Sequence, residues 1–342
     1  MKNHRTIVVA DHHKSVFVCQ VLDRETGEVT RKTLSSRRQE LEPFLRELAG
    51  PALVYVEACR AWEWVSDLCE ELDVELRLVN PSKMPEIWRS TKKTDRADVE
   101  VMIQRLQVMG ELPESHRMTR PQRELRALTR RLGDFRQQRR RILNQIHAII
   151  DSNGMPAKKE SFKKAAWREE MKSRLSELTW LEIEVLLLSY DQNRALTGLL
   201  EMKLSEVLKD RIDDQRLQTI PGVGPVIAAT ILAESAGIAR FKKARQYAAY
   251  TGLVPRVRSS AGKARTGHIT RCGPPLLRWA LGQAAMIGLS CKQQTEISRM
   301  YRRKRKQKPG RVAVSAAAHK LARVTWAILA RERDFKASCS AA

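Results

Sequence analysis

The sequence contains no apolar run long enough to cross a bilayer, which would take about 20 consecutive apolar residues. Its N-terminal segment, MKNHRTIVVADHHK, also lacks the long apolar core of a signal peptide, because the apolar stretch is short and meets Asp11 early. These two absences predict a cytoplasmic protein that has no membrane partner.

Paired cysteines are missing as well. The six cysteines are scattered without a C-x-x-C pair, so we predict free thiols in a reducing compartment and neither a zinc site nor a disulfide framework. Aromatic residues make up only 5% of the chain, and the seven tryptophans are too dispersed to form a platform on which bases could stack.

Acidic residues are outnumbered. The 342-residue chain has 63 Lys and Arg against 39 Asp and Glu, which gives a net charge of +24. Such an excess predicts a polyanionic partner, and nucleic acid fits best. The alternative is a merely basic, ribosome-like surface. The charge is spread along the whole chain, however, and this does not fit a simple basic tail.

The first third of the sequence predicts a mixed α/β domain over residues 1–112. Apolar and alternating segments predict strands, and longer amphipathic segments predict helices between them. The strands are expected at 5–11, 16–23, about 29–35, 52–58 and 74–80, and the helices at 36–49, 61–72 and about 94–109. This βββαβαβα order describes one sheet with helices on its faces.

The rest of the chain predicts helical structure. A heptad seam of apolar residues runs from Leu125 to Ile149 with one basic interruption, and a second apolar helix runs from about Leu175 to Leu208. We therefore predict a helical coiled-coil stalk over residues 113–212. Residues 213–342 predict a mostly helical C-terminal domain with one glycine-rich basic loop at about 254–274.

Four carboxylates of the first domain are candidates for a metal site. Asp11 and Glu57 end two apolar strands, and Asp95 and Asp98 stand three apart in TKKTDRADVE, so they share a helix face. Converging carboxylates repel unless cations neutralise them, and hard oxygen ligands suit one or two Mg²⁺ ions. The alternative for the Asp95 and Asp98 pair alone is a solvated surface helix.

Two segments of the C-terminal domain are candidates for DNA contact. In IPGVGP, Gly222 and Gly224 lie between two helical patterns and are similar to a helix-hairpin-helix turn, although an ordinary helix–helix turn reads the same way. In RVRSSAGKARTGHITRCG, Ser259 and Ser260 lie among basic residues. From chemistry alone these serines fit a phosphate-gripping loop better than a nucleophile, because a hydroxyl needs activation.

The predicted nucleic-acid contacts combine these glycines with the basic side chains near the candidate sites. They are Lys92, Lys93, Arg96, Gly222, Gly224, Arg256, Arg258, Lys263, Arg265, Arg271, Arg302, Arg303, Lys304 and Arg305.

Taken together, the motifs resemble one family. The order of the acids, the KTDRAD box, IPGVGP, GLVPR with the following SSAGK, GHIT, GPPLLRWAL and the final PGRVAVSAAAHKLARV are similar to the DEDD transposases of bacterial insertion sequences. This is the insertion-sequence 110 family, which also includes pilin-type DNA invertases. The resemblance covers almost the whole chain and is weakest in the stalk.

The resemblance implies a fold, a reaction and partners. The N-terminal domain is expected to have a RuvC/RNase H-like fold whose acidic tetrad (Asp11, Glu57, Asp95 and Asp98 here) binds Mg²⁺. The C-terminal domain is expected to supply a serine that joins covalently to DNA, matched best by Ser260, with Ser259 as the adjacent alternative. Members act on DNA as dimers or tetramers, with the serine of one subunit facing the acids of another. Some members use an RNA encoded by the element to choose DNA.

This chain departs from the family pattern beside two of its acids. His12 and His13 follow Asp11, and Cys59 and Arg60 follow the Ala that comes after Glu57, where the family usually has Thr and Gly. No carboxylate is lost. The expected activity is therefore that of a transposase that cuts and rejoins DNA. The rival functions are a Mg²⁺-dependent, structure-selective nuclease similar to a junction resolvase, and a non-catalytic nucleic-acid-binding protein.

Overall fold

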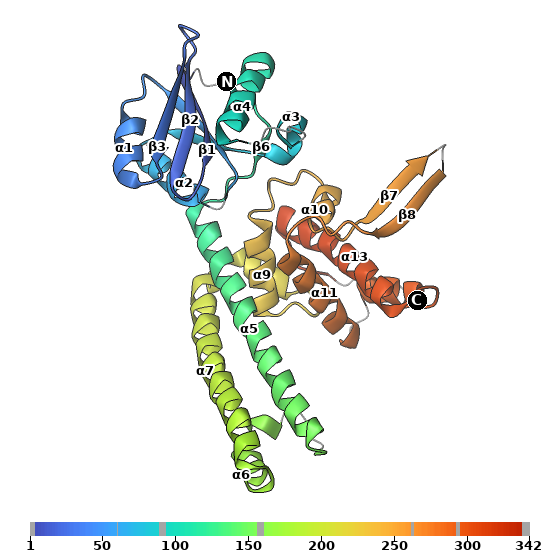
Figure 1. Ribbon diagram of the computed structural model, residues 1–342. Helices are drawn as coiled ribbons and strands as arrows, with labels where there is room; N and C mark the ends of the chain where they lie inside the picture. Colours follow the sequence, from blue (N-terminus) through green and yellow to red (C-terminus); the bar gives the residue numbers. More distant parts are fainter. Residues whose placement is uncertain are drawn as a thin grey trace. The chain divides into compact units, whose positions relative to one another are not determined.

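The computed structural model describes residues 4–59, 61–88, 94–155, 161–260, 263–291 and 295–336, and the side chains of 87, 88, 163, 258–260 and 263–266 lie outside this description. The chain forms two compact units, unit 1 (Met1–Arg120) and unit 2 (Pro121–Ala342) (Figure 1). No helix in the described part of the chain is both long enough and apolar enough to span a membrane. The division of the chain into three domains remains a prediction.

Unit 1 is built on a six-stranded sheet in the order β3-β2-β1-β4-β5-β6. Strand β1 pairs antiparallel with β2 and parallel with β4, and β4 pairs parallel with β5. The mixed α/β fold predicted for this part of the chain is confirmed. The two-residue strand β6 was not among the predicted strands. The strands are β1 (Thr6–His12), β2 (Val16–Asp23), β3 (Val29–Ser35), β4 (Ala52–Glu57), β5 (Glu75–Val79) and β6 (Glu114–Ser115).

Helices cover both faces of this sheet. Val8 and Ala10 of β1 lie in the core under α1 and α2, whereas Ile7 and Val9 lie in the core under α4. Because β1 is buried on both faces, it reads as a continuous apolar run rather than an alternating one. The helical segments of unit 1 are α1 (Arg38–Arg46), α2 (Trp62–Glu71), the 3-10 turn η1 (Pro81–Lys83), α3 (Pro85–Trp88) and α4 (Asp95–Met109).

Unit 2 begins with two long helices that run side by side (Figure 1), α5 (Arg120–Ser152) and α7 (Glu177–Leu208). They are connected through the 3-10 turn η2 (Ser161–Lys163) and α6 (Ala165–Arg174). Apolar side chains from α5, η2, α6 and α7 form one buried cluster at the connected end of the hairpin. The two long helices predicted for the stalk are present, and coiled-coil packing between them remains a prediction.

The rest of unit 2 is a helical domain with one β-hairpin. Its core is formed mainly by α8 to α11 and α13, with many small alanine side chains at the contacts. The segment predicted as a basic loop forms two antiparallel strands instead, so that prediction was wrong. The elements are α8 (Ile212–Gln218), α9 (Pro225–Ser235), α10 (Ala244–Tyr250), β7 (Pro255–Ser260), β8 (Lys263–Ile269), α11 (Pro275–Ser290), α12 (Glu296–Arg305) and α13 (Gly310–Ala330).

The hairpin forms because its two ends are held together at the base. The amide of Thr270 donates to the carbonyl of Val254 at 2.8 Å. Gly273 has a φ of +104°, and a Cβ there would overlap the carbonyl oxygen of Tyr250. The composition of Gly and Ser predicted a loop, but this close approach of two distant segments favours pairing of the chain between them.

A buried ion cluster joins α5 to α9. The side chain of Glu234 is fully buried, and it accepts hydrogen bonds from Arg126 at 3.0 Å and from Arg130 at 2.7 Å. Both arginines are partly exposed, with 25% and 51% of their side chains accessible. Removing the arginines would therefore leave a buried charge unpaired, whereas removing the carboxylate would leave two arginines that water can still reach.

We expect the double variant Arg126→Gln, Arg130→Gln to lower the free energy of unfolding of unit 2 by about 3–5 kcal/mol, because it leaves a buried carboxylate without its cations. Glu234→Gln should lower the free energy of unfolding by less, about 1–3 kcal/mol, because Arg126 and Arg130 can both reach solvent. Urea unfolding followed by tryptophan fluorescence measures both. Equal losses in the two variants would contradict this asymmetry.

Candidate active site

Two of the predicted acids stand at the ends of neighbouring parallel strands. Ala10 pairs with Val56 in the β1–β4 register, so Asp11 and Glu57 follow at the same edge of the sheet. Both lie on the face that α4 covers, because side chains alternate along a strand and Val9 and Tyr55 point into the core under α4.

The other two acids begin α4. The Thr94 hydroxyl caps the helix by accepting the amide of Ala97 at 3.2 Å, which fixes where the first turn starts. Asp95 and Asp98 lie in that first turn, where the positive end of the helix dipole favours carboxylates. The helix start predicted near Thr94 is confirmed.

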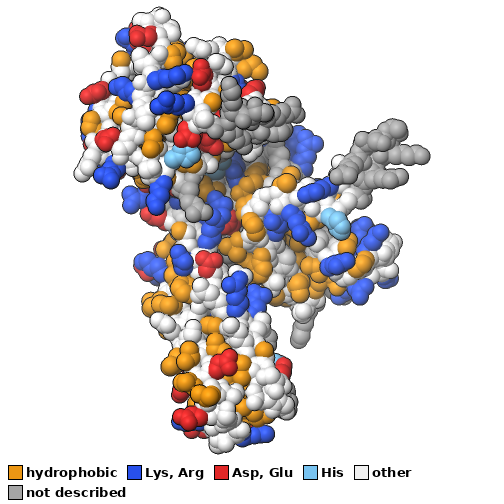
Figure 2. Space-filling model, in the orientation of Figure 1, with side chains coloured by type: hydrophobic (Ala, Val, Ile, Leu, Met, Phe, Trp, Pro, Cys, Tyr) orange, Lys and Arg blue, Asp and Glu red, His pale blue; other side chains and the backbone are white. Residues whose placement is uncertain are grey.

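His13 links the strand to the helix, and the sequence prediction had not given it a role. Its Nε2 lies 3.1 Å from Oδ2 of Asp11 and 3.2 Å from Oδ1 of Asp95. The donor atoms of Asp11, His13 and Asp95 all lie within 4.8 Å of one another. Figure 2 shows acidic and histidine side chains in contact on the visible face of unit 1.

The carboxylates influence one another's ionisation. Burial is the largest cause of the raised pKa of Asp11; the charge of His13 opposes it, and those of Asp95 and Asp98 add to it. Burial also raises the pKa of Glu57, and the charges of Asp11 and Asp98 raise it further. The four predicted acids are thus near enough to repel one another, which favours the presence of a cation.

His12 belongs to the opposite face of the sheet. Its Nε2 lies 2.6 Å from the Ser36 hydroxyl, and its ring packs edge-on against Trp64 at 5.6 Å between centroids. Burial lowers the pKa of His12, which favours the neutral imidazole. Of the two adjacent histidines, only His13 faces the acids.

The donor set fits a divalent cation. Asp11 is 95% buried at its side chain, so an uncompensated charge there would be costly. Asp95 and His13 are half-exposed, which leaves open positions for water or a phosphate oxygen. β1 supplies Asp11, the residue that follows β1 is His13, and α4 supplies Asp95, so the donors come from two elements that pack on each other in one unit.

Of the three phosphate contacts predicted in unit 1, Lys92 and Lys93 lie outside the described residues. Arg96 lines a pocket of about 220 Å³ together with Arg31 and Lys32 of β3. Arg31 already pairs with Glu100 of α4 at 3.1 Å, so Arg96 and Lys32 supply the remaining positive charge of this pocket.

The two glycines of IPGVGP have different surroundings. Gly222 has a φ of +92°, and a Cβ there would overlap the carbonyl oxygen of Ala284 in α11. The positive φ and the close contact with α11 are enough to explain why position 222 is a glycine, and the explanation needs no ligand. Gly224 is exposed, caps the start of α9, and has open space where a Cβ would stand. Both glycines line one open pocket, and the contact with DNA and the helix-hairpin-helix role remain predictions.

We expect Gly224→Asp to weaken DNA binding about tenfold at low salt, because it places a negative charge beside the expected phosphate. Asp is also a good N-cap, so the fold should not suffer. Gly224→Asn is the matched control, with the same size and capping ability but no charge. Fluorescence anisotropy with labelled duplex DNA measures both. Equal affinities for the two variants would remove this turn from the DNA interface.

The basic residues of the β7–β8 hairpin are described at its base. The Arg278 guanidinium donates to the carbonyl of Gly273 at 2.7 Å, and burial together with the charge of Arg271 lowers its pKa. Arg256 donates to the carbonyl of Thr270. These three arginines make the hairpin base cationic. The side chains of Arg258, Ser259, Ser260, Lys263 and Arg265 lie outside the described residues, and the register pairs Ser260 with Lys263.

A second basic group ends α12. Its last turn contains Arg302, Arg303, Lys304 and Arg305, which are exposed or half-exposed. Cations at the C-terminal end of a helix are stabilised by its dipole, so these residues can project charge without destabilising the helix.

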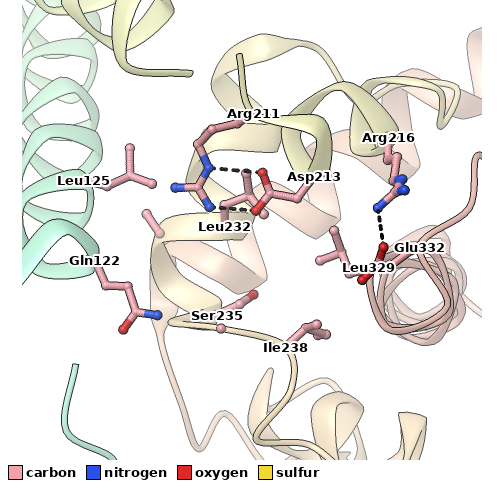
Figure 3. Close-up of a pocket in the computed structure, with 12 residues that line it drawn as sticks. Gln122, Leu125, Arg211, Asp213, Arg216, Leu232, Ser235, Ile238, Leu329 and Glu332 are labelled. Carbon is pink, nitrogen blue, oxygen red and sulfur yellow. Dashed lines mark hydrogen bonds and ion pairs between the residues drawn. The ribbon is translucent and has the colours of Figure 1, made fainter. Parts of the chain in front are cut away.

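A partly open pocket of about 240 Å³ lies among α5, α8, α9 and the end of α13 (Figure 3). Its two arginines already have acidic partners: Arg211 pairs with Asp213 at 2.6 Å, and Arg216 pairs with Glu332 at 3.6 Å. Because the charges are neutralised within the pocket, it is a poor candidate for binding phosphate.

Two family profiles match the chain, one that runs from unit 1 through α5 and one that lies within the helical domain of unit 2. The profile of DEDD transposases of the IS110 group matches residues 8–154, and that of the "Transposase IS116/IS110/IS902 family" matches residues 214–302. The chain is 27% identical over 336 residues to a "Probable family 20 transposase" of Pseudomonas aeruginosa, covering 95% of this chain and 97% of the relative.

Two further relatives are named for insertion sequences. The transposase of element IS1328 from Yersinia enterocolitica is 25% identical, with 94% of this chain and 96% of the relative aligned. The transposase of element IS1111A from Coxiella burnetii is 27% identical, with 96% and 91% aligned. With both profiles and full-length relatives in agreement, this chain belongs to the IS110 family of insertion-sequence transposases, enzymes that cut and rejoin DNA.

Proposed function

We propose that the protein moves an insertion sequence by cutting and rejoining DNA with a metal-holding acidic site in unit 1 and a nucleophilic serine in unit 2. The observation that carries this proposal is the convergence of acids from β1, β4 and α4, with Asp11 buried among like charges. A DEDD family implies a divalent metal ion, and we propose Mg²⁺ as the ion of the native reaction.

The proposed roles of the acids follow from their positions. Asp11, Glu57, Asp95 and Asp98 hold the metal, which when bound neutralises charge on the reacting phosphate. Asp11 is the fixed ligand, because its strand is buried on both faces of the sheet. Asp95 and Asp98 are carried by the first turn of α4, and its cap at Thr94 holds them toward β1.

Ser260 is the proposed nucleophile. Its hydroxyl oxygen attacks a DNA phosphorus, a phosphoserine bond forms, and the bond from phosphorus to one sugar oxygen breaks. The serine loses its proton, and the leaving sugar oxygen gains one. A hydroxyl of another strand then attacks the phosphoserine and releases Ser260. Arg256, Arg271 and Arg278 at the base of the same hairpin can bind DNA phosphates and so support this role.

The partners of this reaction are polyanions. The net charge of +24 and the exposed basic turn of α12 favour DNA at the element ends and the target. The family resemblance adds an element-encoded guide RNA to the proposal. RNA transcribed from the flanks of the gene should bind more tightly than a shuffled RNA of equal length.

The test is a denaturing gel of purified protein with Mg²⁺, labelled DNA that spans the element junction, and the flanking RNA. Wild type, Ser260→Ala and Asp95→Ala are compared. A covalent protein–DNA band lost in both variants is the expected result. Cutting that survives Ser260→Ala without a covalent band would indicate a water-using nuclease. Binding without cutting in wild type would indicate a non-catalytic protein.

We also propose that a second copy of the chain covers α7. This helix is apolar on two faces, and one of them contacts α5 while the other is exposed. Figure 2 shows hydrophobic side chains gathered along the lower part of the helical hairpin. The exposed members are Leu178, Leu181, Val185, Leu188, Leu196, Leu199, Met202 and Val207.

A protein partner fits this stripe better than nucleic acid does. Within a chain of +24, α7 has six acidic residues and only two basic ones. A helix that is apolar on opposite faces needs a partner on each face to be stable in water. A two-fold axis would place the stripe of one copy against the same stripe of another. Such an assembly agrees with the homo-oligomer that the family resemblance implies.

We expect the double variant Leu181→Lys, Leu188→Lys to dissociate the oligomer, because it puts like charges into the apolar stripe. Light scattering after gel filtration should give the mass of a single 39.1 kDa chain for this variant and a multiple of it for wild type. Ser205→Lys adds one positive charge at an exposed position of α7 away from the stripe and should leave the assembly intact. A wild type that is monomeric would refute the interface.

A further inference from the structure

His13 is the one histidine that the described part of the chain places between two carboxylates. It follows β1, and its backbone is fixed by a hydrogen bond from its amide to the carbonyl of Val16 at 2.8 Å. Residues 11 and 13 point to the same face of an extended chain, so Asp11 and His13 turn toward α4 together. Asp95 meets them from the start of that helix.

We propose that His13 is itself a metal ligand, so that the site of this chain has a mixed set of nitrogen and oxygen donors and prefers Mn²⁺ to Mg²⁺. This rests on the proposed metal-dependent function and adds to it a ligand from outside the acidic tetrad. The carboxylates alone would provide a purely oxygen-based site, which suits Mg²⁺.

The geometry supports a shared ligand position. Nε2 of His13 is within 3.2 Å of oxygens from both Asp11 and Asp95, and all three donor atoms fit within 4.8 Å. A cation placed among the three side chains could be bound by one donor atom of each, in place of the two direct contacts that His13 makes with Asp11 and Asp95. Because the His13 side chain is about half exposed, its ring has room to adjust its angle.

The chemistry of imidazole sets the metal preference. Imidazole nitrogen is a good ligand for transition-metal ions, whereas Mg²⁺ strongly prefers oxygen and keeps its water. Mn²⁺ accepts carboxylates as readily as Mg²⁺ does, and it stands on the transition-metal scale that imidazole favours. A single histidine in a carboxylate site therefore discriminates between two ions of equal charge.

The test uses full-length protein and the metal ions themselves, without DNA. Pulsed electron paramagnetic resonance of bound Mn²⁺ detects the nitrogen of a coordinated imidazole directly. Wild type should show nitrogen modulation, and His13→Asn should lose it. His147→Asn is the matched control, because His147 also lies beside an aspartate, Asp151, at 2.7 Å but in unit 2. This control should keep the signal.

Titration calorimetry gives the second readout. His13→Asn should weaken Mn²⁺ binding by at least about tenfold, the lower end of what losing even an outer-shell partner costs, and should change Mg²⁺ binding by much less. Circular dichroism checks that the variant, altered at a half-exposed position, remains folded. An equal loss for both ions would overturn the proposed preference.

The outcomes separate this inference from the function on which it rests. Bound Mn²⁺ without nitrogen modulation in wild type would make His13 a counter-ion of the acids and refute the inference alone. If Mn²⁺ bound equally well to wild type and Asp11→Asn, or to neither, the acidic site would not be a metal site. Both the inference and the proposed function would then fail.

Discussion

Asp11→Asn should reduce DNA cleavage by about a thousandfold or more while leaving the protein folded. A metal held at the reacting phosphate contributes several kcal/mol to transition-state stabilisation, and each 1.36 kcal/mol is about a factor of ten in rate. Asp11 is the most buried of the four acids, so no water-exposed carboxylate can take its position. Rates of junction cleavage under single-turnover conditions measure the effect.

Asp11→Asn should raise the stability of the metal-free protein, although it lowers the cleavage rate. The pKa of Asp11 is raised in the folded protein, so the fold binds its proton more tightly than the unfolded chain does. The free energy of unfolding without metal therefore falls as pH rises from the ordinary carboxylate pKa through the raised one. Asparagine has no proton to lose in this pH range, so Asp11→Asn removes the fall in the free energy of unfolding. Metal-free melting temperatures at pH 7 should be higher for the variant than for wild type.

Asp73→Asn is the matched control for both measurements. Asp73 is an exposed aspartate of the same unit with a φ of +55°, a conformation that asparagine tolerates. This variant should keep wild-type cleavage and wild-type melting. If Asp11→Asn cut DNA as fast as Asp73→Asn, the buried carboxylate would have no part in the reaction.

The acidic site was predictable from the sequence because each acid is tied to a regular element. Asp11 and Glu57 end apolar runs, and parallel strands place their carboxyl ends at one edge. Asp95 and Asp98 follow a capping threonine, which defines the helix start. Local patterns of this kind determine where a side chain emerges before any tertiary contact is known.

Other features depend on contacts between distant segments, which a linear pattern does not contain. The basic loop is a hairpin because Gly273 lets residues 270–273 close on the end of α10. Gly222 packs closely against α11, a helix some 60 residues later in the chain, and no local pattern predicts that contact. His13 was noticed only as a departure from the family. Its spacing of two from Asp11 on extended chain was the signal available.

The second large effect concerns how the serine and the acids combine. We expect Ser260→Ala and Asp11→Asn to be inactive alone and active when mixed, because the family resemblance implies a site that joins the serine of one subunit to the acids of another. In a mixed dimer one site then carries both substitutions and the other carries neither. If subunits exchange freely in an equal mixture, half of the dimers are mixed, so about one quarter of the sites are intact.

The measurement is the amount of covalent protein–DNA complex formed by the mixture, relative to wild type at the same total concentration. A site built within one subunit would leave the mixture as inactive as either variant, because every subunit lacks one group. Adding Leu181→Lys and Leu188→Lys to both partners should abolish the recovered activity, since assembly through α7 is then lost. Recovery that survived those lysines would place the productive contact elsewhere on the chain while still requiring two copies. The mixing experiment thus separates the origin of the serine from the surface that brings the subunits together.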